Sequence, residues 1–195
     1  MINDIIFNDL LIELKDNPKR LKHIIGVKET ALKFGRKFNL DLNILETAAL
    51  LHDITKYYTF EQNKEVIDSY FEDASNIYIN YNENILHAFS AYVIAKEKYN
   101  IKDGEILNSI LSHTIGRANM SIYEKIIFIS DYIEPNRTYE SCIKVRLIAE
   151  TSIDKAVFTA IDDSIMFYEA NDGIIPLIAY EARNYYRNLL EVQHD

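Results

Sequence analysis

The sequence predicts an all-α protein. Apolar residues recur at three- and four-residue steps along most of the 195 residues, capping signals separate these stretches, and no segment shows the alternation of a half-buried strand. With 48% hydrophobic residues the chain can bury a core as one domain over residues 1–195. We expect a metal-binding helical core over about residues 18–137 and C-terminal helices over about residues 151–192.

Two helices are predicted at the N-terminus. The first covers residues 3–15, and Asn17-Pro18 ends it and begins the second, because proline is favoured at the first helical position. The second helix runs to about Phe38. It carries His23 on its inward stripe, and Arg20 lies one turn earlier on the same side, so the two side chains can address one site.

The third helix, with Asp41 or Asn43 as its expected cap, ends in the doublet His52-Asp53. Neighbouring helical residues point about 100° apart, so they rarely address one target unless the helix ends there. A metal ion can accept both donors, an imidazole nitrogen and a carboxylate oxygen. Lys56 follows one turn later and can reach back over such a metal.

The middle of the chain supplies two more histidines. Thr59-Phe60-Glu61-Gln62 has capping-box spacing and opens a helix to about Phe71, whereas residues 76–82, rich in Tyr and Asn, are predicted to form a loop. Residues 84–99 form a helix with His87 near its start. A helix beginning at residues 103–105 ends at Gly116, which puts His113 in its last turn and Thr114 beside it.

The next predicted helix carries a buried carboxylate. Ser121-Ile122-Tyr123-Glu124 is its capping box and Pro135 ends it. Asp131 interrupts its apolar pattern, where an unpaired carboxylate would cost roughly several kcal/mol, so Asp131 needs a cation or strong donors. Arg137 can fold back toward it. A long helix over residues 151–170 follows, stopped by Asn171-Asp172-Gly173, and Pro176 begins the last helix.

The histidine inventory favours a metal site. One histidine on an apolar face is more often a hydrogen-bonded core residue than a ligand. Here four of the five histidines stand in predicted helices with aliphatic or small neighbours, and only His194, near the end, lacks such a setting.

Charge and cysteine content narrow the function classes. A net charge of −9 disfavours non-specific binding to nucleic acid or anionic membranes, and no stretch reaches membrane-spanning length. A polyphosphate can still bind where a metal and a few basic residues form a positive pocket. The single Cys142 excludes an internal disulfide and a cysteine-based metal site. Since the N-terminus also lacks a signal-peptide pattern, we expect a cytoplasmic protein.

The order of these residues resembles that of the HD-domain metal-dependent phosphohydrolase superfamily, named after its His-Asp doublet. Longer stretches, spread over about residues 18–184, resemble its YqeK-like branch. They are Arg20-Leu21-Lys22-His23, Leu51-His52-Asp53-Ile54-Thr55-Lys56, Leu86-His87-Ala88, His113-Thr114-Ile115-Gly116-Arg117, Glu124-Lys125-Ile126-Ile127, Asp131-Tyr132-Ile133-Glu134-Pro135-Asn136-Arg137 and Glu181-Ala182-Arg183-Asn184. The resemblance implies an HD-domain helical bundle with a C-terminal extension, acting as a symmetrical bis(5′-nucleosyl)-tetraphosphatase. Such enzymes hydrolyse diadenosine tetraphosphate to two ADP, with iron as the associated metal.

The resemblance also implies site residues. The main metal would be held by His23, His52, Asp53 and Asp131. His87 and His113 fall where the superfamily either binds a second metal or contacts the substrate phosphates, so one or two ions are expected. The implied nucleotide and phosphate contacts are Arg20, Lys56, Thr114, Arg137, Ile175, Pro176 and Arg183. Where we expect the family to carry His-Pro, this chain has Ile175-Pro176. This difference leaves undetermined which residues contact the nucleotide base. Arg20, Lys56 and Arg137 fit surface ion pairs equally well.

The expected reaction is attack of a metal-bound hydroxide on a phosphorus of the tetraphosphate bridge, in line with departure of ADP. Iron is the expected metal, and manganese, cobalt or zinc would suit the same donors. Two alternatives stay open: an HD-type nucleotidase or phosphodiesterase for another nucleotide, and a non-catalytic nucleotide-sensing HD domain. Intact ligands at all six positions argue against the sensor. The Tyr- and Ile-rich final helices offer a homodimer surface, although their spacing does not demand one.

Overall fold

The computed structural model describes residues 2–171 and 173–192, and over these residues the chain forms eleven α-helices and no strand. The predicted all-α class is therefore confirmed. The helices are α1 (Ile2–Glu13), α2 (Pro18–Lys37), α3 (Leu42–Leu51), α4 (Phe60–Asp68), α5 (Ala74–Asn80), α6 (Glu83–Glu97), α7 (Gly104–Ser112), α8 (Ile122–Ile133), α9 (Glu140–Ala149), α10 (Ile153–Ala170) and α11 (Leu177–Val192). Asp172, in the predicted helix stop, and His194 lie outside the described residues.

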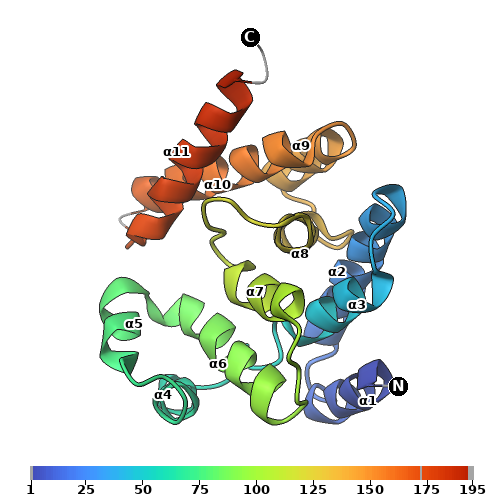
Figure 1. The fold of residues 1–195 in the computed structure, drawn as a ribbon, viewed down its shortest axis with the longest axis vertical. Coiled ribbons are helices and arrows are strands. Elements are labelled where there is room, and N and C mark those ends of the chain that lie inside the picture. Colours follow the sequence, from blue (N-terminus) through green and yellow to red (C-terminus); the bar gives the residue numbers. More distant parts are fainter. Residues whose placement is uncertain (1, 172, 193–195) are drawn as a thin grey trace.

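Helix α8 lies in the middle of the molecule, between the N-terminal helices and α9 to α11 (Figure 1). It packs against α2, α3, α7, α9 and α10, and its residues 126–130 are all buried, as expected of a helix covered on every side. The main core extends from Ile6 in α1 through α8 to Tyr186 in α11. No described helix has the length and apolarity that a membrane span requires.

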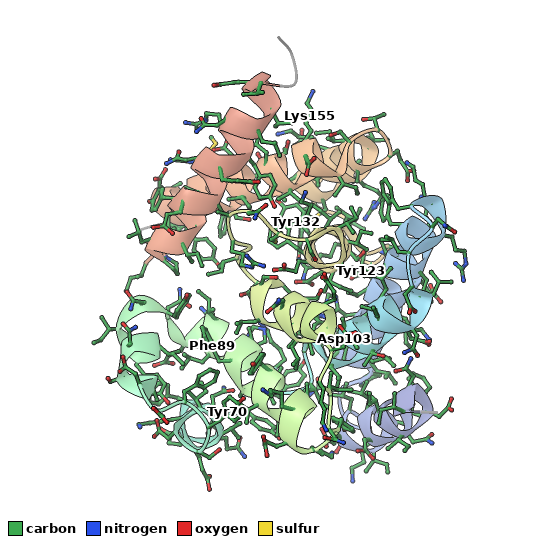
Figure 2. The ribbon with its side chains drawn as sticks, viewed as in Figure 1. Tyr70, Phe89, Asp103, Tyr123, Tyr132 and Lys155 are labelled. Atoms are coloured by element: carbon green, nitrogen blue, oxygen red, sulfur yellow. The ribbon has the colours of Figure 1, made fainter. Side chains whose placement is uncertain are left out.

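A smaller core holds α4, α5 and α6 together. It contains Ile67, Leu86 and Phe89, and Figure 2 shows Tyr70 and Phe89 in this part of the molecule. The segment after α3, which carries the His-Asp doublet, connects α3 of the main core with α4 of the smaller core.

Side-chain caps mark where several of the helices begin. Asp41 accepts a hydrogen bond from the backbone N–H of Asn43 at the start of α3. Both predicted capping boxes form, at Thr59 and at Ser121. Asn17 makes no side-chain capping hydrogen bond, so Pro18 alone marks the start of α2.

Two helices differ from the prediction. The predicted loop over residues 76–82 is wrong, because residues 74–80 form α5, which buries Ala74 and Ile77 against the smaller core. No element is predicted between residues 138 and 150, yet α9 lies there and buries Cys142, Val145 and Ala149. In α5, tertiary packing outweighs the weak helix preference of Asn and Tyr.

Candidate metal centre

Five helices deliver six polar side chains to one place. His23 comes from α2, His52 and Asp53 directly follow α3, His87 lies in α6, His113 follows α7, and Asp131 lies in α8. The four imidazoles are at most 8% exposed. The structure thus brings together all six of the positions that the sequence singles out as metal ligands or catalytic histidines.

Asp53 lies at the centre of this group. Its Oδ2 is 3.5 Å from Nε2 of His23 and 3.4 Å from Nε2 of His52. Its Oδ1 is 3.2 Å from Nε2 of His87 and 3.6 Å from Nε2 of His113. Asp131 joins from α8, with Oδ1 3.1 Å from Nε2 of His23. Four imidazole nitrogens and two carboxylates therefore converge.

The second ring nitrogen of each histidine is held by the protein. Nδ1 of His52 and of His113 lies 2.7 Å from a backbone carbonyl oxygen three residues earlier, and Nδ1 of His87 lies 2.8 Å from another. Nδ1 of His23 is 3.3 Å from the carboxylate of Glu134. An imidazole that donates through Nδ1 presents the Nε2 lone pair to a cation. Since Nε2 of His23 and of His52 are buried without a hydrogen-bond partner among the described residues, the donor set fits a divalent metal.

Both carboxylates are anionic at neutral pH. Burial raises the pKa of Asp131, but the guanidinium of Arg137 and the nearby imidazole of His23 outweigh it and hold the pKa well below its usual value. Burial opposes ionisation of Asp53 too, and the surrounding imidazoles lower its pKa. Burial also lowers the pKa of His87, which favours its neutral form.

A cavity of about 280 Å³ opens beside this group, with three cationic side chains in its lining. Arg20 pairs with Asp53, and Nη2 of Arg137 is 2.7 Å from Oδ1 of Asp131. Nζ of Lys56 lies 3.3 Å from Nε2 of His87. Thr114 lines the cavity as well, and its hydroxyl is buried without a partner among the described residues.

Much of the apolar part of this lining comes from the C-terminal helices and the segment between them. Tyr168 near the end of α10 contributes, as do Ile175 and Pro176 before α11. Arg183 is not brought to the cavity: its Nη1 lies 3.6 Å from Asp162, and its guanidinium covers the ring of Tyr180. The structure thus gives no support to the predicted nucleotide contact at Arg183, because an ion pair between α10 and α11 holds its side chain.

Glu134 is the residue of this centre that the sequence patterns did not indicate. It is 2% exposed, and its carboxylate accepts hydrogen bonds of 2.7 Å from the backbone and side-chain N–H groups of Asn136 while facing Nδ1 of His23. The sequence signal available for Glu134 was the position of its carboxylate between the end of a helix and Pro135. Its contact with α2 spans more than a hundred residues of sequence, which periodicity does not reveal.

A family model described as the HD domain matches residues 20–136, a range that contains all six converging residues. A symmetrical bis(5′-nucleosyl)-tetraphosphatase of Halalkalibacterium halodurans is 35% identical over 158 residues, which cover 80% of this chain and 83% of the relative. One of Bacillus subtilis is 33% identical over 159 residues, 80% of this chain and 84% of the relative. This chain belongs to that family of HD domain proteins.

The fold of this chain agrees with its assignment to the HD domain family. A crystal structure described as a predicted HD superfamily hydrolase involved in NAD metabolism, from Clostridium acetobutylicum, is 34% identical with a TM-score of 0.86, covering 95% of this chain and 96% of that one. HD domain hydrolases depend on metals. Two groups here have ligand atoms within 4.8 Å of one another and could hold an ion: His23, His52 and Asp131, and His52, Asp53 and His113.

Proposed function

We propose that this HD domain protein hydrolyses diadenosine tetraphosphate symmetrically, giving two ADP. The names of its relatives from H. halodurans and B. subtilis describe that activity. One observation carries the proposal for this chain: four Nε2 atoms and two carboxylates converge at the wall of a cavity whose lining also holds Arg20, Lys56 and Arg137. This combination suits a metal and a polyphosphate together.

The main metal would be held by His23, His52, Asp53 and Asp131, and His87 and His113 would complete its ligands or hold a second ion. When bound, such a metal lowers the pKa of a coordinated water and polarises a phosphoryl oxygen. Imidazole and carboxylate donors suit iron, manganese, cobalt and zinc. We propose iron, which the family resemblance implies.

The three cations would bind the phosphates. Arg20 and Arg137 each contact one of the two carboxylates, so their charges lie beside the place where the metal would bind. Guanidinium groups bind phosphate oxygens through paired hydrogen bonds, whereas Lys56 acts as a compact positive charge. Thr114 offers its unpartnered hydroxyl to the same phosphates. These groups would neutralise charge that develops on the phosphoryl oxygens.

Lys56 is a better candidate than His87 for the group that donates a hydrogen bond or a proton beside the departing ADP. A protonated His87 or His113 is the alternative donor to the leaving oxygen. Because burial lowers the pKa of His87, a neutral ring with a lone pair toward Asp53 suits a metal ligand better than an acid. Nζ of Lys56 lies 3.3 Å from that ring and also lines the cavity, where it can donate to a phosphate oxygen.

The adenosine of one half would lie against the apolar lining of the cavity. Tyr168, Ile175 and Pro176 supply this surface, so we include residues 175 and 176 in the proposed nucleoside contacts and leave Arg183 out. Cytoplasmic location, a homodimer and the absence of nucleic-acid binding stay predictions from the sequence.

The test is a product analysis. Iron-loaded protein is incubated with diadenosine tetraphosphate, and the nucleotides are separated by chromatography, with Asp53→Ala as the control. ADP as the sole product, lost in Asp53→Ala, supports the proposal. AMP with ATP, or phosphate released from mononucleotides, would contradict it and favour the nucleotidase or phosphodiesterase alternative.

A further inference from the structure

A second cavity adjoins the metal centre. It has a volume of about 170 Å³ and shares Lys56, Asn84 and His87 with the first cavity. His87 is also the residue whose Nε2 lies 3.2 Å from Oδ1 of Asp53. Because both cavities contain residues of the metal centre in their linings, one extended ligand can occupy both.

The fold holds the wall of the second cavity in place. Asn63, only 5% exposed, accepts a hydrogen bond of 2.6 Å from Ser90 in α6. Its side-chain amide donates to the backbone carbonyls of Tyr58 and Thr59 at the start of α4. These bonds tie the segment before α4 to α6, so the cavity has a structured wall.

The lining suits a nucleoside. Tyr58 and Phe60 supply aromatic rings, and Phe60 is 39% exposed, so its ring is accessible to a ligand. Bases stack on such rings with little dependence on base identity. The carboxylate of Glu83 can accept hydrogen bonds from ribose hydroxyls or from an amino group. Lys56, where the two cavities meet, can contact phosphate.

We propose that the second cavity binds the nucleoside of one ADP half while the first cavity binds the other half. This inference rests on the proposed function. Symmetrical cleavage breaks the bond between the two central phosphates, so the two equal ends of the substrate extend in different directions from the metal centre. A single cavity beside the metal accommodates one end, and the lining shared through Lys56 and His87 gives the other end its own site.

The experiment compares a ligand that has a nucleoside at both ends with a ligand that has a nucleoside at one end. Holoenzyme is assayed for the KM of diadenosine tetraphosphate and for the inhibition constant of adenosine 5′-tetraphosphate, which has one nucleoside and is expected to use the larger cavity. Phe60→Ala should raise the KM roughly 10-fold, the effect of one lost stacking contact, and change the inhibition constant less than about twofold. Phe60→Tyr keeps the ring and should retain the wild-type KM.

Phe38→Ala is the matched control, because Phe38 has the same 39% exposure as Phe60 and lies outside both cavities. An unchanged KM in Phe60→Ala would overturn the inference. Equal increases for both ligands would also overturn it, since the ring would then support the first cavity or the fold. If the wild-type enzyme produces no ADP, the proposed function fails, and the inference fails with it.

Discussion

Glu134 approaches α2 so closely at Gly26 that a Cβ at position 26 would lie 2.6 Å from its Oε2. The same carboxylate faces Nδ1 of His23 at 3.3 Å. The absence of a side chain at Gly26 thus allows a buried carboxylate to reach the ring that faces Asp53 and Asp131 through its other nitrogen.

Gly26→Ala is therefore expected to weaken metal binding. The new methyl group would displace Glu134 and press on Asn136 and Pro135, which lie 3.2 and 3.4 Å from the added Cβ. Loss of a carboxylate that orients a histidine ligand typically lowers metal affinity by about 10-fold or more. Competition against a chromophoric chelator measures the affinity. Gly104→Ala is the control, since a Cβ there has no atom within 4 Å, and equal affinities in the two variants would contradict the assignment.

Metal addition should stabilise the protein. A ligand that binds only the folded state at about 100 times its dissociation constant adds about 2.7 kcal/mol, which for a chain of this size corresponds to an increase in Tm of about 5 to 10 °C. Thermal unfolding with and without metal measures this change. Asp53→Ala removes the central carboxylate and should abolish the increase. An equal increase in this variant would show that the metal binds elsewhere.

Arg117→Ala should destabilise the fold. Nε and Nη2 of Arg117 lie 2.7 and 2.5 Å from the two carboxylate oxygens of Glu124, which is 1% exposed. Among the described residues, the substitution leaves that buried carboxylate with only the backbone N–H of Ser121 as a donor, to Oε1. We expect a loss of about 2 to 3 kcal/mol in the free energy of unfolding. Urea denaturation measures it. In a Glu124→Gln background the loss should be smaller, and an equal loss would contradict the ion-pair explanation.

Alkaline pH should destabilise the protein through Tyr99. Burial is the main cause that raises its pKa to about 12, and its hydroxyl donates to Oδ2 of Asp9 at 2.8 Å. In the unfolded chain tyrosine ionises near pH 10, so from about pH 10 to 12 the unfolded state has lost a proton that the folded state keeps, and stability falls. Tyr99→Phe should flatten this fall in urea denaturation.

Tyr139→Phe is the matched control for this prediction. Tyr139 is 67% exposed, so removing its hydroxyl should leave the pH dependence unchanged. An equal flattening in both variants would show that Tyr99 is not the responsible group.

Local signals in the sequence were sufficient for most of the helices. Both capping boxes form as predicted through hydrogen bonds within a few residues, and Pro18 marks the start of α2 without such a bond. The predicted loop at residues 76–82 fails because α5 depends on burial of Ile77, a tertiary effect. Helix α9 had a local signal in the spacing of Cys142, Val145 and Ala149, which are buried.

The candidate site, like the helices, has some features that local sequence signals indicate and others that only tertiary packing determines. Residue type and helical spacing indicated the converging histidines and carboxylates, because metal ligands are chemically distinctive and lie on inward helix faces. The ion pair between Arg183 and Asp162 and the approach of Glu134 to Gly26 join segments that are distant in sequence. The pairing of such segments is fixed by the packed fold, and one sequence contains no local record of it.

Thr114→Val should impair catalysis without impairing stability. The hydroxyl of Thr114 is buried in the cavity lining and has no hydrogen-bond partner among the described residues, so its loss removes no contact within the protein. If the hydroxyl binds a substrate phosphate, the KM for diadenosine tetraphosphate should rise about 10-fold or more, the usual effect of losing one hydrogen bond to a charged group, while Tm stays equal or increases. Steady-state kinetics and thermal unfolding measure the two effects. Thr159→Val, whose hydroxyl donates to the carbonyl of Lys155 within α10, should leave the KM unchanged. A wild-type KM in Thr114→Val would remove Thr114 from the phosphate site and leave Arg20, Lys56 and Arg137 as its proposed contacts.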